Sequence, residues 1–160
     1  MCHKILIILG MLSCLSVGAA TCRPVFATQN DRLNQAPLEQ LAADFRRLRT
    51  VPGHFGGGKW DDDVDRWMGT KHRLMLELGT RLGRGEFSKP DVIQLLNPPD
   101  QFARKGDRSY QQIVSLPGYD AMPDAPDEFL IYNWRGRHDF LFFTCQGGKI
   151  IGSDWWYEGD

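Results

Sequence analysis

The spacing of apolar residues predicts two amphipathic helices in the first half of the chain. Residues 37–49 (PLEQLAADFRRLR) open with a proline suited to a first helical turn, and apolar residues follow at intervals of three or four: Leu38, Leu41, Phe45 and Leu48. A second, longer helix is predicted over residues 61–82, with an apolar stripe of Val64, Trp67, Met68, Met75, Leu78 and Leu82. Between them, one proline and several glycines in residues 51–59 predict a loop. Each helix needs an apolar surface to cover.

Shorter segments follow in the middle of the chain. Ser88, with Pro90 two residues on, predicts the cap and first turn of a short helix that runs to Leu96. Asn97-Pro98-Pro99 ends that helix, since proline cannot continue it. Residues 101–108 are predicted to form a polar loop and residues 112–116 a short strand.

The pattern changes after residue 128 to aromatic and β-branched segments separated by turns. Three strands are predicted, over residues 129–134, 138–145 and 149–157. Gly147-Gly148 is a strong hairpin signal, and Gly136 marks the earlier turn. The predicted fold class is therefore α+β: two or three N-terminal helices packed on a C-terminal antiparallel sheet, a meander of three to four strands.

The pairing of these strands determines which aromatic residues share a face. A turn at Gly147-Gly148 places Phe140 opposite Trp155 and His138 opposite Tyr157. For the first hairpin, a three-residue turn at 135–137 sets Trp134 opposite His138, whereas a two-residue turn at 136–137 sets Asn133 opposite Phe140. The three-residue turn gathers an aromatic face, which is the candidate binding surface: Tyr132, Trp134, His138, Phe140, Trp155 and Tyr157. Exposed aromatic patches of this kind are typical of contact sites. Cross-strand aromatic pairs also stabilise any antiparallel sheet, and this is the favoured explanation for most of these residues.

Catalytic and metal-binding patterns are weak in this chain. Successive side chains of a strand point to opposite faces, so His138 and Asp139 are not expected to share a proton or a metal ion. His72, in the predicted second helix, is expected to be a hydrogen-bonded core histidine. We predict no catalytic residues, no metal site and no cofactor, because no histidine pair has the i, i+4 spacing and no Gly-x-Ser-x-Gly occurs.

Acidic residues cluster at the start of the predicted second helix. The run Asp61-Asp62-Asp63 is expected to lie in its first turn, where the helix dipole favours negative charge. Asp62 is expected to pair with Arg66 one turn further on.

The N-terminus has the composition of a secretory signal peptide. Residues 1–27 contain a basic start, an apolar run from Ile5 and small residues, with cleavage expected after Ala20 or after Ala27. The apolar run is short for a membrane span, which needs about 20 residues. Residues 28–160 then form one domain, secreted or in the periplasm or cell envelope. Cleavage after Ala20 would let Cys22 pair with Cys145, whereas cleavage after Ala27 would leave Cys145 as a small buried apolar residue.

Charge excludes one class of partner. The formal net charge is −1, with 19 basic and 20 acidic residues, so we predict no nucleic-acid partner, which would call for a clustered basic surface.

One stretch resembles a known family. The segment PDVIQLLNPPD (90–100), followed by FLIYNWRG, HDFLFFTCQGGKI and IGSDWWY, resembles the helix-then-hairpin unit of the SmpA/OmlA (BamE-like) envelope lipoproteins and of β-lactamase-inhibitory protein. Val92, Leu95, Leu96, Pro98 and Pro99 match, and Asn97 stands at the glycine position. The resemblance implies a secreted or envelope-located binding module that uses its sheet for protein contacts.

Two functions are weighed from these features. The first is an exported, non-enzymatic binding module that contacts a protein partner through the aromatic sheet face. The alternative is a small secreted hydrolase or ligand-binding protein that uses a pocket around His138, with Tyr157 and Arg135.

Overall fold

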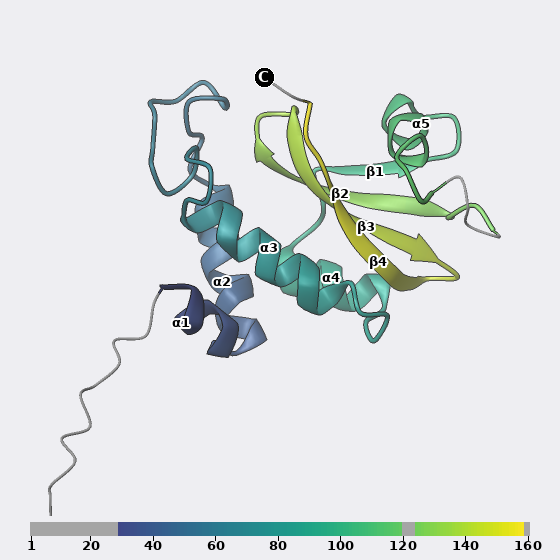
Figure 1. Cartoon of the computed structure of the whole chain (residues 1–160), viewed down its shortest axis with the longest axis horizontal. Coiled ribbons are helices and arrows are strands. Elements are labelled where there is room, and N and C mark those ends of the chain that lie inside the picture. The colour runs from purple at the N-terminus through teal and green to yellow at the C-terminus, as the bar shows by residue number, and fades with distance from the viewer. Residues whose placement is uncertain (1–28, 120–123, 159–160) are drawn as a thin grey trace, which may run out of the picture.

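The computed structural model of the chain describes residues 29–119 and 124–158, which form helices on both faces of one sheet (Figure 1). The expected signal peptide and Cys22 lie outside the described residues. The helices are α1 (Gln29–Gln35), α2 (Leu38–Arg49), α3 (Thr70–Leu82), α4 (Lys89–Leu96) and α5 (Arg108–Val114). The strands are β1 (Gln101–Arg104), β2 (Glu128–Arg135), β3 (Asp139–Gln146) and β4 (Lys149–Trp156). They pair antiparallel in the order β1-β2-β3-β4, so the predicted α+β class is confirmed.

Three layers follow from the two apolar clusters. Helices α2, α3 and α4 cover one face of the sheet, and their apolar residues pack against these sheet residues: Leu130, Tyr132, Leu141, Phe143, Cys145 and Ile150. Helix α5 covers part of the other face, where a smaller cluster contains Ala103, Phe129, Ile131, Phe140 and Phe142. The sheet is the middle layer, and Cys145 is the small buried residue expected for a chain in which it does not pair.

The capping signals gave the correct local structure for α4. Ser88 and Asp91 form a capping box, in which the Ser88 side chain accepts a hydrogen bond from the Asp91 backbone N–H and the Asp91 carboxylate accepts one from the Ser88 backbone N–H. The helix ends at Leu96, before Asn97 in a left-handed conformation (φ +66°).

The predicted helix over residues 61–82 is shorter than expected, because α3 begins only at Thr70. Aspartate side chains hold the preceding residues in turns. The Asp61 carboxylate accepts from the backbone N–H of Asp63 (2.9 Å), and Asp65 accepts from that of His54 (2.9 Å). Side chains that bond nearby backbone in this way compete with helix formation. The acidic run therefore builds a loop rather than capping a helix, although the exposed Asp62–Arg66 pair is present at 3.4 Å.

The predictions for residues 101–116 were wrong in both parts. The expected polar loop contains β1, because Ala103 pairs with Phe129 of β2 and fills the second apolar cluster. The expected strand is part of α5, whose buried residues Tyr110 and Ile113 are three positions apart. Both elements are short and acquire their structure by packing on the sheet, so their local pattern is weak.

Two irregularities set the registers of the hairpins. Gly147 and Gly148 form the predicted turn with φ of +57° and +75°, but the pairing shifts by one residue beyond Cys145. Phe140 therefore lies opposite Trp156 instead of Trp155. In the first hairpin Asn133 pairs with Phe140, as in the two-residue alternative, and the register shifts again at Trp134. A shift of one residue moves a side chain to the other face of the sheet.

Candidate functional site

The structure does not gather the six predicted site residues on one face. Tyr132 and Trp134 are buried under the helices, Trp155 is half-buried on the same face, and Tyr157 is 40% exposed just beyond β4. Phe140 lies in the apolar cluster on the opposite face. His138 is exposed in the β2–β3 turn. The single aromatic face was wrong because the first hairpin has Asn133 opposite Phe140 and the second hairpin contains a register shift.

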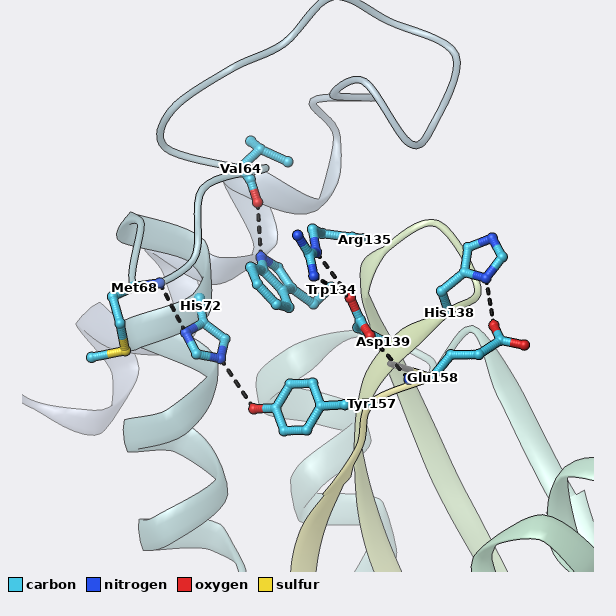
Figure 2. Close-up of polar contacts among 9 residues, drawn as sticks. All are labelled: Val64, Met68, His72, Trp134, Arg135, His138, Asp139, Tyr157 and Glu158. Carbon is cyan, nitrogen blue, oxygen red and sulfur yellow. Dashed lines mark hydrogen bonds and ion pairs between the residues drawn. The ribbon is translucent and has the colours of Figure 1, made fainter. Parts of the chain in front are cut away.

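Three of the six, Trp134, Trp155 and Tyr157, nevertheless belong to one aromatic cluster, which is centred on His72 of α3. The His72 ring lies 4.2 Å from that of Trp134, and Trp155 and Tyr157 stack on each other at 5.3 Å. Trp134 donates its indole N–H to the carbonyl of Val64 (2.8 Å), which ties the loop before α3 to strand β2 (Figure 2). The cluster thus joins the loop, α3 and the ends of two strands.

His72 is the buried, hydrogen-bonded histidine predicted from sequence. Its Nδ1 accepts from the Met68 backbone N–H (3.3 Å), so the ring proton lies on Nε2 and is donated to the Tyr157 hydroxyl oxygen (3.2 Å). Burial, and then the positive charge of Arg135, lower the pKa of His72 to about 4, partly opposed by Asp139. The imidazole is therefore neutral at physiological pH, with both nitrogens engaged.

The tyrosine keeps a hydroxyl proton of its own. Burial, followed by the carboxylates of Asp139 and Asp154, raises the pKa of Tyr157 to about 12. Because His72 donates to its oxygen, the Tyr157 O–H is left to donate outward.

His138 and Asp139 have different partners, as the strand geometry suggested. Asp139 is buried and accepts from the Arg135 guanidinium (2.9 Å from Nε) and from the Glu158 backbone N–H (3.3 Å). His138 instead points away toward the Glu158 carboxylate, to which it is hydrogen-bonded (Figure 2). The structure therefore does not bring His138 together with Tyr157, as a site built on His138, Tyr157 and Arg135 would require.

Arg135 connects this cluster to the glycine-rich loop. Its guanidinium lies 4.2 Å from the centre of a Trp134 ring and 5.1 Å from that of Phe55. Such cation–π contacts are favourable by about 0.5–1 kcal/mol when exposed. Phe55 in turn lies 6.4 Å from Trp60.

The side chains that this end of the molecule exposes come mainly from the loop of residues 51–69. We call them the aromatic end surface: Phe55, Trp60, Trp67, Met68 and Tyr157, each 40–55% exposed. Trp67 links the loop to the cluster below, with its ring 5.3 Å from Tyr157 and 4.5 Å from His72. Sequence reasoning missed Trp67 and Met68 because it placed them on the buried stripe of a helix. The aspartate density before Gly69 is the signal that would have indicated a loop.

The loop is held rigidly on the domain. Asp65 is buried and accepts from two backbone N–H groups, those of His54 and Asp61. Gly53 (φ +57°) sits against it, and a Cβ at this position would lie 2.5 Å from the Asp65 carboxylate. Buried Lys71 donates to the Trp134 carbonyl (2.8 Å), and burial lowers the pKa of its ammonium group to about 8.

The described residues were also searched for other site types. They contain no group of three or more His, Cys, Asp or Glu side chains placed to hold a metal ion. Among the same residues, no helix has the length and apolar character needed to span a membrane.

Comparisons with known proteins add no family to this picture. No family model matches the chain, and searches of curated proteins and of solved structures found no match. The resemblance to the SmpA/OmlA and β-lactamase-inhibitory units stays a prediction. The fold and the site together define an α+β domain with an exposed aromatic surface at one end.

Proposed function

We propose that the chain is an exported, non-enzymatic binding module that contacts a protein partner through the aromatic end surface. The observation that carries this proposal is the distribution of exposed apolar side chains. Among the described residues, six large apolar side chains are exposed, and all but Ile151 belong to this surface. Scattered exposed apolar residues are ordinary, whereas their concentration at one end is typical of an interaction site.

The residue types suit a protein interface. Trp and Tyr dominate the energetics of protein contacts, because each buries a large area and keeps a polar group for a hydrogen bond. Tyr157 retains an outward O–H donor, since His72 donates to its oxygen. The transfer of apolar surface out of water is favourable by a free energy of about 25 cal/mol per Å².

Backbone conformation also supports a binding role. Met68 has φ +57°, a left-handed conformation that a side chain other than glycine adopts at a cost of about 1–2 kcal/mol. Its backbone N–H is held by His72, and its side chain stays 40% exposed. Strain of this kind gathers at functional sites.

The loop scaffold would lower the cost of binding. Asp65, Trp134 and Arg135 hold the loop in place without a partner. A surface that is already ordered loses little conformational freedom on association. By contrast, the contacts of His138 do not support the alternative of a hydrolase with a pocket around this residue, since its ring is exposed and bonded to Glu158.

The experiment is cross-linking capture with matched variants of the purified protein in envelope extract or culture medium. Trp67→Ser removes the most exposed ring that touches the cluster, and Ile151→Ser removes a similarly exposed apolar side chain elsewhere. We expect one cross-linked partner with the wild type and with Ile151→Ser, and at least a tenfold loss with Trp67→Ser. Equal capture by both variants, with unchanged melting curves, would refute this surface as the contact site.

Export is tested separately. The mass of the protein recovered from the envelope or medium distinguishes cleavage after Ala20 from cleavage after Ala27. Recovery of an uncleaved chain inside the cell would refute the export part of the proposal.

A further inference from the structure

A second concave site lies on the opposite face of the sheet from α2–α4. It is a cavity of about 590 Å³ between α5 and the β2–β3 turn, which we call the α5 cavity. The residues that matter to its chemistry are Arg108, Ile131, Asn133, Arg137, Phe140 and Trp156. Ligand sites of small molecules have volumes of about 300–1,000 Å³.

One part of the α5 cavity lining is apolar, formed by Ile131, Phe140 and Trp156. The Phe140 and Trp156 rings pack almost parallel, at an interplanar angle of 13° and a centroid distance of 6.3 Å. Ile131 is buried beside them. Phe140 is nearly buried and Trp156 is half-buried, so a planar ring in the cavity would pack mainly on the exposed part of Trp156.

The available charge in the α5 cavity is positive. Arg108 from α5 and Arg137 from the turn both line it, and among the described residues neither guanidinium has a hydrogen-bond or ion-pair partner. Guanidinium groups bind carboxylates through paired, charge-assisted hydrogen bonds.

The two acids at the edge of the cavity are already engaged. Asp100 forms an ion pair with Arg49 (2.8 Å) and accepts from the Asn133 backbone N–H (2.7 Å). The Glu158 carboxylate is bonded to His138. Asp100 is thus neutralised by Arg49, whereas the half-exposed Glu158 keeps its charge, so the two arginines outnumber the one uncompensated acid in the lining.

We propose that the α5 cavity binds a small molecule that carries an aromatic ring and a carboxylate. The ring packs on Trp156 beside Phe140, and the carboxylate binds Arg108 and Arg137. Asn133 offers an amide that can donate to or accept from a polar substituent of the ring. This proposal is independent of the aromatic end surface, with which the α5 cavity shares no residue.

Isothermal titration calorimetry with three probes tests both parts of the recognition. The probes are indole-3-acetate, its neutral analogue indole-3-acetamide, and acetate, which lacks the ring. We expect indole-3-acetate to bind more tightly than about 1 mM, as a good ligand of its size does. The acetamide should bind at least about tenfold more weakly, and acetate should give no heat.

Variants locate the site. Arg108→Gln and Arg137→Gln each remove one exposed guanidinium and should each weaken indole-3-acetate binding about tenfold. Lys105→Gln removes the same charge three residues before Arg108, outside the cavity lining, and should leave binding unchanged. Melting curves of the three variants should coincide with that of the wild type.

Several results would overturn the proposal. One is the absence of binding at several millimolar indole-3-acetate, and another is equal binding of the acid and the amide. Wild-type affinity in both arginine variants would place any binding elsewhere. Inorganic phosphate binding as tightly as indole-3-acetate would indicate charge recognition without the ring, which also contradicts it.

Discussion

Two aromatic clusters lie on opposite faces of the same sheet, and they differ in how they are covered. On the helix side, His72 and Trp134 are 1% exposed, and a tethered loop closes over them. On the α5 side, Trp156 is only half-buried and stands beside an open cavity. The elements that pack on each face explain this difference in exposure. The helix side receives three helices and the loop of residues 51–69, whereas the other face receives mainly α5, a helix of seven residues. Trp134 is therefore core on one face, whereas Trp156 on the other face lines a cavity.

The largest expected effect comes from removing an indole on each side. Trp134→Ala should lower the free energy of unfolding by about 3–5 kcal/mol, because it leaves a cavity and an unpaired Val64 carbonyl. Trp156→Ala should cost about half as much, because part of that ring already faces solvent. Chemical denaturation of both variants measures the difference. Equal losses of unfolding free energy would mean that the two tryptophans are equally shielded from solvent.

The second expected effect is a pH dependence of stability that comes from the helix side of the sheet. The pKa of His72 is about 4 in the folded state against 6.5 for an ordinary histidine, so the unfolded chain binds the extra proton between these values. Stability therefore falls as pH is lowered from about 6.5 to 4, by up to about 2–3 kcal/mol. Glutamine does not titrate, so the stability of the His72→Gln variant should lack this pH-dependent component when unfolding is measured between pH 6.5 and 4. Parallel curves for wild type and variant would contradict the burial of a neutral imidazole.

A smaller effect tests the strained residue that covers His72. Met68→Gly and Met68→Ala remove the same contacts, but only glycine adopts φ +57° without steric cost. We expect the glycine variant to be more stable than the alanine variant by about 1 kcal/mol in denaturant titrations. Greater stability of the alanine variant would show that the left-handed conformation is not under strain.

The smallest effect concerns the second histidine of this end. His138→Ala removes only an exposed contact with Glu158, so unfolding should change by less than about 0.5 kcal/mol. The contrast with His72→Gln sharpens the comparison between a buried and an exposed histidine. A loss as large as that of His72→Gln would mean that the turn is part of the core.

Particular elements show how far the sequence determined the fold. The helix cap at Ser88, the helix predicted over residues 37–49 and the Gly147-Gly148 turn depend on neighbouring residues, and the structure contains all three, with the helix over residues 38–49. Three of the four strands were also predicted, since their aromatic and β-branched runs are long. The candidate site was predicted only in part: three of its six residues, Trp134, Trp155 and Tyr157, meet at His72. Tyr132, Phe140 and His138 lie elsewhere.

The register of the strands and the exposure of individual side chains were decided only by the tertiary structure. The pairing shifts by one residue near Cys145 and again near Trp134. The shift near Cys145 exchanges the faces of the β4 residues beyond it, so Trp155 packs on the helix side and Trp156 on the other. Such a shift is set by packing across the sheet, so no local pattern records it. The same holds for β1, which exists as a strand because β2 pairs with it. The loop before α3 likewise exposes Trp67 and Met68 because buried Asp65 holds it in turns instead of helix. Local sequence thus determined which elements form, and the packing of those elements decided which aromatic residues reach the surface.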